Sequence, residues 1–142
     1  MEKRALNLPR VGLVGCFSGG SNTGSLTEMA ALEAVRRLGD GVVGILSLPA
    51  LLNKVPRQSS LVKKIERVIV VDGCHNRCAI QLVQGVGIRP VGYVNLERDL
   101  GLRKSGPFTS LEFTGQEVNR VAEAIIAAIR LAEQGVVQDL GS

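Results

Sequence analysis

Four short runs of apolar residues lie within the first hundred positions, and their spacing restricts the possible fold more than any other feature. Each run is followed by a turn rich in glycine or polar residues and, in most cases, by a segment with the three- and four-residue spacing of a helix. The runs lie at 11–16, 41–48, 67–72 and 90–96. This alternation predicts an α/β fold with a mainly parallel, four-stranded sheet.

The third run, Arg-Val-Ile-Val-Val-Asp at 67–72, is nearly continuous β-branched sequence. Such a run is typical of a strand covered on both faces, so we expect it near the centre of the sheet. We therefore predict a three-layer, Rossmann-like arrangement with strand order 2-1-3-4 and helices on both faces. Residues 49–60 are expected to form a loop or short helices. We find no repeat and no linker, so a single domain over 1–142 is expected.

Two pairs of residues have the spacing of a helix N-terminal capping box. Ser25 and Glu28 precede the first helical segment, and Thr114 and Glu117 precede a long amphipathic segment near the C-terminus. Between the last strand and that segment, residues 97–113 show no clear periodicity. This predicts a loop of functional length or a partial lid.

Composition and charge exclude several classes of function. The chain has no long apolar stretch and no signal peptide, so we expect neither a membrane span nor secretion. The net charge of +4 comes from scattered basic residues that are not interleaved with aromatic ones, which argues against nucleic-acid binding. Three cysteines leave one thiol over in any intramolecular disulfide scheme. We therefore expect a soluble cytoplasmic protein with free or metal-bound thiols.

All three cysteines lie at or just after the carboxyl end of a predicted strand. Cys16 ends the first strand, and Cys74 and Cys78 follow the third. On a helix the i, i+4 spacing would place Cys74 and Cys78 on one face, and Cys16 faces the same point if the first and third strands are neighbours. Zinc takes four ligands in structural sites and three plus an open position in catalytic ones. The sequence thus predicts zinc on these three cysteines, with an incomplete shell.

Two nearby residues are candidates for the fourth ligand or for a supporting role. Asp72 ends the third strand, where it would ligate the metal, act as a base or bind loop N–H groups. His75 would point about 100° away from Cys74 on a helix, so a supporting or surface role suits it better than ligation. Because helix N-termini lower thiol pKa values, we expect Cys78, and with it Cys74, to be partly ionised.

The turn after the first strand is a second candidate site. Its glycines and hydroxyl groups precede a predicted helix, so its backbone N–H groups are suited to binding an anion. A phosphate-binding P-loop requires lysine where Ser25 stands, so the loop itself has no lysine to meet a phosphate. The predicted anion-binding loop consists of Ser18, Gly19, Gly20, Ser21, Asn22, Thr23 and Gly24.

The two segments together resemble the DGC domain family, which is named after its Asp-Gly-Cys motif and described as zinc-binding. The resemblance rests on Cys-Phe-Ser-Gly-Gly-Ser-Asn-Thr-Gly at 16–24 and on Asp-Gly-Cys-His-Asn-Arg-Cys-Ala at 72–79. It covers roughly residues 10–105. It implies a small cytoplasmic α/β protein whose three cysteines are the metal ligands. It indicates the site but names no reaction.

Three functions stay open at this level. The first is a zinc-binding protein that is catalytic or handles metals or thiols. The second is a metal-free thiol protein for redox chemistry or persulfide transfer, with Cys74 or Cys78 as the nucleophile and Cys16 as the resolving thiol. The third is a module that binds a small anionic molecule or nucleotide through the glycine-rich loop alone. The apolar C-terminal helix suits a dimer as well as a core, so the oligomeric state is also open.

Overall fold

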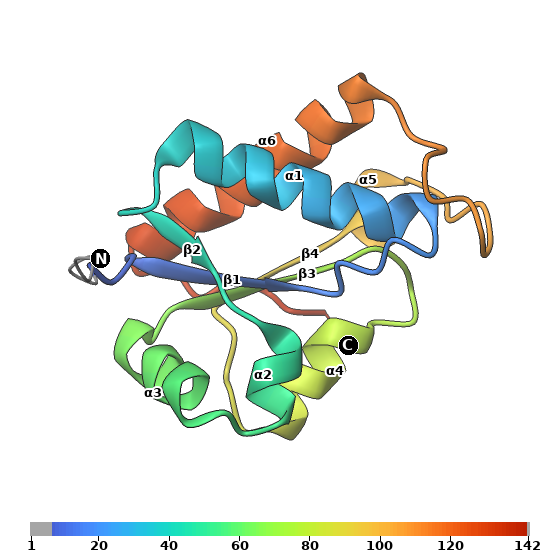
Figure 1. Cartoon of the computed structure of the whole chain (residues 1–142). Helices are drawn as coiled ribbons and strands as arrows, with labels where there is room; N and C mark the ends of the chain where they lie inside the picture. Colours follow the sequence, from blue (N-terminus) through green and yellow to red (C-terminus); the bar gives the residue numbers. More distant parts are fainter. Residues whose placement is uncertain (1–6, 142) are drawn as a thin grey trace, which may run out of the picture.

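The structure is a computed structural model that describes residues 7–141 and is built around one parallel sheet (Figure 1). The sheet order is β2-β1-β3-β4, and every neighbouring pair of strands is parallel. The predicted fold class and the predicted order 2-1-3-4 are thus confirmed. The strands are shorter than the apolar runs that predicted them: β1 (Val11–Gly15), β2 (Val43–Ile45), β3 (Val68–Asp72) and β4 (Gly92–Asn95).

Helices cover both faces of this sheet. In Figure 1, α1 and α6 lie on one face, and α2, α3 and α4 lie on the other, which is the predicted three-layer arrangement. No helix of the described residues is long and apolar enough to cross a bilayer. The helices of residues 7–141 are α1 (Asn22–Leu38), α2 (Leu48–Leu52), α3 (Pro56–Ile65), α4 (Cys78–Gly85), α5 (Leu96–Leu100) and α6 (Gly115–Glu133).

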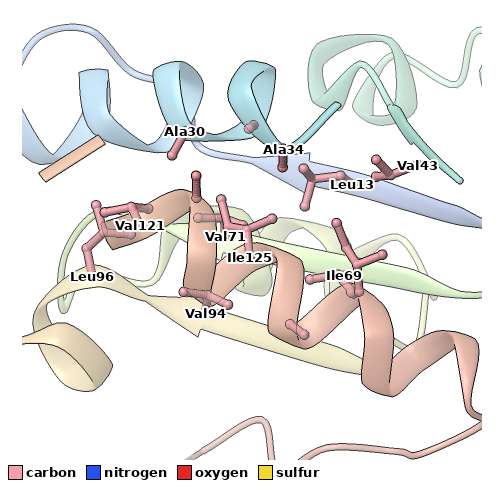
Figure 2. Close-up of a cluster of buried hydrophobic side chains, with 14 of the residues drawn as sticks. Leu13, Ala30, Ala34, Val43, Ile69, Val71, Val94, Leu96, Val121 and Ile125 are labelled. Atoms are coloured by element: carbon pink, nitrogen blue, oxygen red, sulfur yellow. The ribbon is translucent and has the colours of Figure 1, made fainter. Parts of the chain in front are cut away.

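Strand β3 separates two apolar cores and contributes side chains to both. Ile69 and Val71 pack in the core under α1 and α6, which Figure 2 shows in close-up. Val68 and Val70 pack in the other core, under α2, α3 and α4. All five residues of β3 are buried, because alternate side chains of a strand point to opposite faces and both faces are covered here.

The predicted start of the first helix is wrong. α1 begins at Asn22, because Ser21 is its N-cap and accepts a hydrogen bond from the N–H of Gly24 (3.2 Å). The capping box predicted at Ser25 and Glu28 is therefore not used. The last three residues of the predicted anion-binding loop belong instead to the first helical turn.

The other predicted helix boundaries are closer to the structure. The capping box of Thr114 and Glu117 is present at the start of α6. Residues 49–60 contain most of α2 and the first half of α3. Helix α5 occupies the first residues of the region 97–113, which was predicted as a loop. Residues 101–114 form neither helix nor strand.

The segment 101–114 is tied to the start of α1 through Asn22. The Nδ2 of Asn22 donates to the carbonyl of Arg103 (3.0 Å), and its Oδ1 accepts from the N–H of Ser105 (2.8 Å). The backbone N–H of Asn22 donates to the Oγ1 of Thr109 (3.0 Å). These bonds hold the segment at the carboxyl edge of the sheet. It makes up most of the region for which the sequence predicted a loop of functional length or a partial lid.

Gly73, just after β3, touches the first turn of α1 and leaves no space for a side chain. A Cβ there would lie 2.9 Å from the carbonyl carbon and oxygen of Thr23. Gly73→Ala has to push two backbone segments apart, so we expect the free energy of unfolding to fall by about 1–3 kcal/mol. Urea denaturation in the presence of EDTA measures this loss without a metal contribution.

Gly41→Ala is the matched control, because a Cβ at Gly41 would meet no atom within 4 Å. We expect its stability to be unchanged or to rise by about 0.4–1 kcal/mol, since alanine lowers the entropy of the unfolded chain. Equal stability of the two variants would contradict the close approach at Gly73.

Candidate functional site

A pocket of about 280 Å³ is lined by Cys16, Cys74 and Cys78 together, and we call it the thiol pocket. Cys16 follows β1, Cys74 lies in the turn after β3, and Cys78 is the first residue of α4. All three cysteines are free thiols. They meet because β1 and β3 are neighbours, so their carboxyl ends share one edge of the sheet, as the sequence predicted.

Cys74 and Cys78 do not share a helix face, which corrects the i, i+4 prediction. Helix α4 begins only at Cys78, because Arg77 before it has a left-handed backbone (φ 56°). The turn between β3 and α4 is closed by a hydrogen bond from the N–H of Arg77 to the carbonyl of Cys74 (3.2 Å). Cys74 therefore reaches the thiol pocket from a turn and Cys78 from a helix start.

Asp72 is only 2% exposed and holds the start of α4. Its carboxylate accepts the N–H groups of Ala79 (2.9 Å) and Ile80 (3.1 Å) and the hydroxyl of Tyr93 (2.9 Å). The first N–H groups of a helix lack partners within the helix, and Arg77 provides no side-chain cap. Asp72 caps α4 instead, with both oxygens occupied, which favours a supporting role over metal ligation.

Tyr93 and Asn95 connect Asp72 to the turn that carries Cys74. The Nδ2 of Asn95 donates to the carbonyl of Cys74 (2.8 Å) and to the hydroxyl oxygen of Tyr93 (3.0 Å). Burial raises the pKa of the Tyr93 hydroxyl, and the Asp72 carboxylate also raises it, so the hydroxyl keeps the proton that it donates to Asp72. Sequence reasoning missed both residues. The one available signal was their polar groups in an otherwise apolar strand.

His75 lies outside the thiol pocket, and its side chain is 82% exposed. Its Nδ1 is 2.9 Å from an oxygen of Glu97, and its backbone N–H donates to the same oxygen (2.8 Å). This is the supporting or surface position that the sequence favoured for His75. A ligand role would require the side chain to leave Glu97 and turn toward the pocket.

The expectation of a lowered thiol pKa is wrong for Cys78. Burial raises the pKa of the Cys78 thiol, and the acidic groups of Asp72, Cys74 and Cys16 raise it further, while the charge of Lys104 opposes them. The helix N–H groups that would stabilise a thiolate are already bonded to Asp72. The chain therefore favours a neutral thiol at this position in the absence of a bound cation.

Part of the predicted anion-binding loop lines the thiol pocket, and part of it serves the fold. Gly24 is required because a Cβ there would overlap the carbonyl oxygen of Ser18. Asn22 is used to hold the segment 101–114, and Gly19 and Gly20 do not line the pocket. The loop residues that line it are Ser18, Ser21, Thr23 and Gly24.

Lys104 is the basic residue among those that line the thiol pocket, and sequence reasoning missed it. It lies in the segment 101–114, which Asn22 ties to the start of α1. The sequence predicted a loop of functional length or a partial lid over residues 97–113. Nothing in its pattern indicated which of its side chains would reach the pocket.

The donor chemistry of the thiol pocket fits zinc, although no coordination shell is formed in advance. Cysteine sulfur is a preferred zinc ligand, and three such residues line the pocket. Among residues 7–141, however, no group of three or more His, Cys, Asp or Glu side chains is arranged to hold a metal ion. Binding of zinc would therefore require the thiols to move from their present positions, including Cys16, whose Sγ lies 3.6 Å from the hydroxyl of Thr27.

A comparison with known protein families agrees with this site. The model of the DGC domain matches residues 12–125, so this chain belongs to the DGC domain family. The match includes both cysteine-containing segments and extends past the middle of α6. No curated protein and no solved structure matches the chain.

The capping role of Asp72 can be tested with Asp72→Asn. This change keeps the size of the side chain but replaces one acceptor oxygen with a donor, so one N–H group of α4 loses its partner in a buried place. We expect the free energy of unfolding to fall by about 1–3 kcal/mol, measured by urea denaturation with EDTA present.

Glu112→Gln is the control, since Glu112 is an exposed acid in the segment 101–114. A surface change of this kind is expected to alter stability by less than about 0.5 kcal/mol. If Asp72→Asn were as stable as the wild type, the carboxylate would not be the cap of α4.

Proposed function

We propose that this protein binds zinc through Cys16, Cys74 and Cys78. The observation that carries the proposal is that all three thiols line one pocket. Two of the three are held there by buried polar side chains, since Asn95 bonds the Cys74 carbonyl and Asp72 caps the helix that begins with Cys78. The resemblance to the DGC domain family implies the same three ligands.

A zinc ion with three protein ligands would provide an open position for water or a substrate, as catalytic zinc sites do. The chain's own groups would set the conditions for loading. Cys78 has to lose its proton, and burial raises the pKa of this thiol. Zinc uptake should therefore weaken as the pH falls, because protons and the metal compete for the same sulfur atoms.

Metal analysis of protein purified without a chelator tests the proposal. We expect close to one zinc ion per chain in the wild type. Cys16→Ser, Cys74→Ser and Cys78→Ser should each lose most of the zinc, because serine oxygen is a poor substitute for a thiolate on this metal.

Ser60→Ala on α3 is the control and should keep the zinc content of the wild type, since Ser60 does not line the thiol pocket. Circular dichroism of each variant in EDTA separates loss of metal from loss of fold. Equally negligible zinc in the wild type and in Cys74→Ser would refute the proposal.

Metal-free thiol chemistry is the second candidate function. It is favoured by three free cysteines in one pocket that holds no ready-made ligand shell within residues 7–141. In that case Cys74 or Cys78 is the nucleophile or persulfide carrier, and Cys16 resolves it. The raised pKa of Cys78 counts against that residue as the nucleophile, because the thiolate is the reactive form.

Thiol reactivity distinguishes the two candidates. The redox function predicts a Cys16–Cys74 or Cys16–Cys78 disulfide after mild treatment with hydrogen peroxide, detected by mass spectrometry, and fast alkylation at one site at neutral pH. Zinc binding predicts uniformly slow alkylation that EDTA makes fast. Fast single-site alkylation without a chelator would therefore count against zinc.

A further inference from the structure

The thiol pocket contains a positive charge that zinc binding does not use. Lys104 lines the pocket, and its ammonium group forms no salt bridge with any carboxylate of residues 7–141. Asp72 is the acidic residue among those lining the pocket, and both of its oxygens already accept hydrogen bonds. The ammonium group is therefore available to a negatively charged ligand.

The backbone on both sides of Lys104 is held by one buried side chain. Asn22 is 6% exposed, and its amide group donates to the carbonyl of Arg103 (3.0 Å) and accepts the N–H of Ser105 (2.8 Å). An amide can do both at once, whereas a carboxylate can only accept. Asn22 thus positions Lys104 at the pocket, and Lys104 supplies the lysine that the glycine-rich loop itself lacks.

Hydroxyl groups are found in the same pocket. Ser18, Ser21 and Thr23 line it together with Lys104, and a hydroxyl group can donate a hydrogen bond to an oxyanion. The volume of about 280 Å³ is just below the range of roughly 300–1,000 Å³ found for ligand pockets. The pocket is thus suited to a small molecule.

We propose that the thiol pocket binds a small molecule with an oxyanion group, a carboxylate or a phosphate, and that Lys104 selects for its negative charge. The oxyanion binds to the ammonium group of Lys104 and to the pocket hydroxyls, and the rest of the ligand faces the thiols. The proposal names the class of ligand for the proposed zinc site, and it rests on that function for the role of the thiols.

The test compares two alkylating reagents that differ in charge, iodoacetate and iodoacetamide, on zinc-free protein. Both react through the same carbon with the thiolate form of cysteine, so the ratio of their rates is independent of how much thiolate is present. Mass spectrometry gives this ratio for each cysteine. In Lys104→Ala, we expect the ratio of iodoacetate to iodoacetamide rates to fall about fivefold, the effect of one charge several ångströms away in a partly hydrated site.

Three further measurements support or overturn the result. Lys64→Ala removes a positive charge from α3, away from the thiol pocket, and should leave the ratio of rates unchanged. Lys104→Arg keeps the positive charge and should keep most of the wild-type preference for iodoacetate. High salt should reduce the difference between the wild type and Lys104→Ala. An equal ratio in the wild type and Lys104→Ala at low salt would overturn the proposal.

Inorganic phosphate distinguishes the two kinds of oxyanion. If phosphate slows iodoacetamide in the wild type but not in Lys104→Ala, the pocket takes a phosphate group. If phosphate slows the iodoacetamide reaction in neither protein, while the preference for iodoacetate still depends on Lys104, the pocket takes a carboxylate. Because the protein is free of zinc here, this proposal and the zinc proposal fail separately: metal analysis decides one, and the charge preference decides the other.

Discussion

The geometry of the site depends on the carboxylate of Asp72 at the end of the central strand. It joins three elements, because it belongs to β3, caps α4 and accepts the hydroxyl of Tyr93 from β4. Cys78 is the first residue of the helix that this carboxylate holds. Its negative charge also adds to the effect of partial burial in raising the pKa of the Cys78 thiol. The same carboxylate therefore holds the helix that begins with Cys78 and disfavours the thiolate form of that residue.

The second constraint is the close approach of two backbone segments at the carboxyl edge of the sheet. Gly73 lies against the first turn of α1, and Gly24 in that turn lies against Ser18, with no space for a Cβ at either glycine. Such an approach is open only to residues without a side chain. It brings the segment after β1 next to the segment after β3, so thiols and hydroxyl groups from distant parts of the chain line one pocket.

Much of the fold could be predicted because its signals are local. The β-branched run of β3 predicted a central strand, and the capping box at Thr114 predicted the start of α6; both predictions are confirmed. The start of α1 was missed because two serines, Ser21 and Ser25, precede the helical pattern and either can cap a helix. In the structure α1 starts at Asn22, and this first turn is hydrogen-bonded to the segment 101–114. No local sequence pattern predicts these bonds, because the two segments are far apart in the chain.

By itself, the sequence determined the class of fold and the edge of the sheet at which the three thiols meet. These follow from residue type and from spacing along the chain, since the ends of parallel strands meet at one edge. Only the tertiary structure decided which polar groups accompany the thiols. Asp72 caps α4, and the ring of His75 lies within hydrogen-bond distance of Glu97. Lys104 lines the pocket from a segment whose sequence has no periodicity. The physical reason is that these roles depend on partners far away in the chain, which contact one another only after the sheet and its two helical layers have formed.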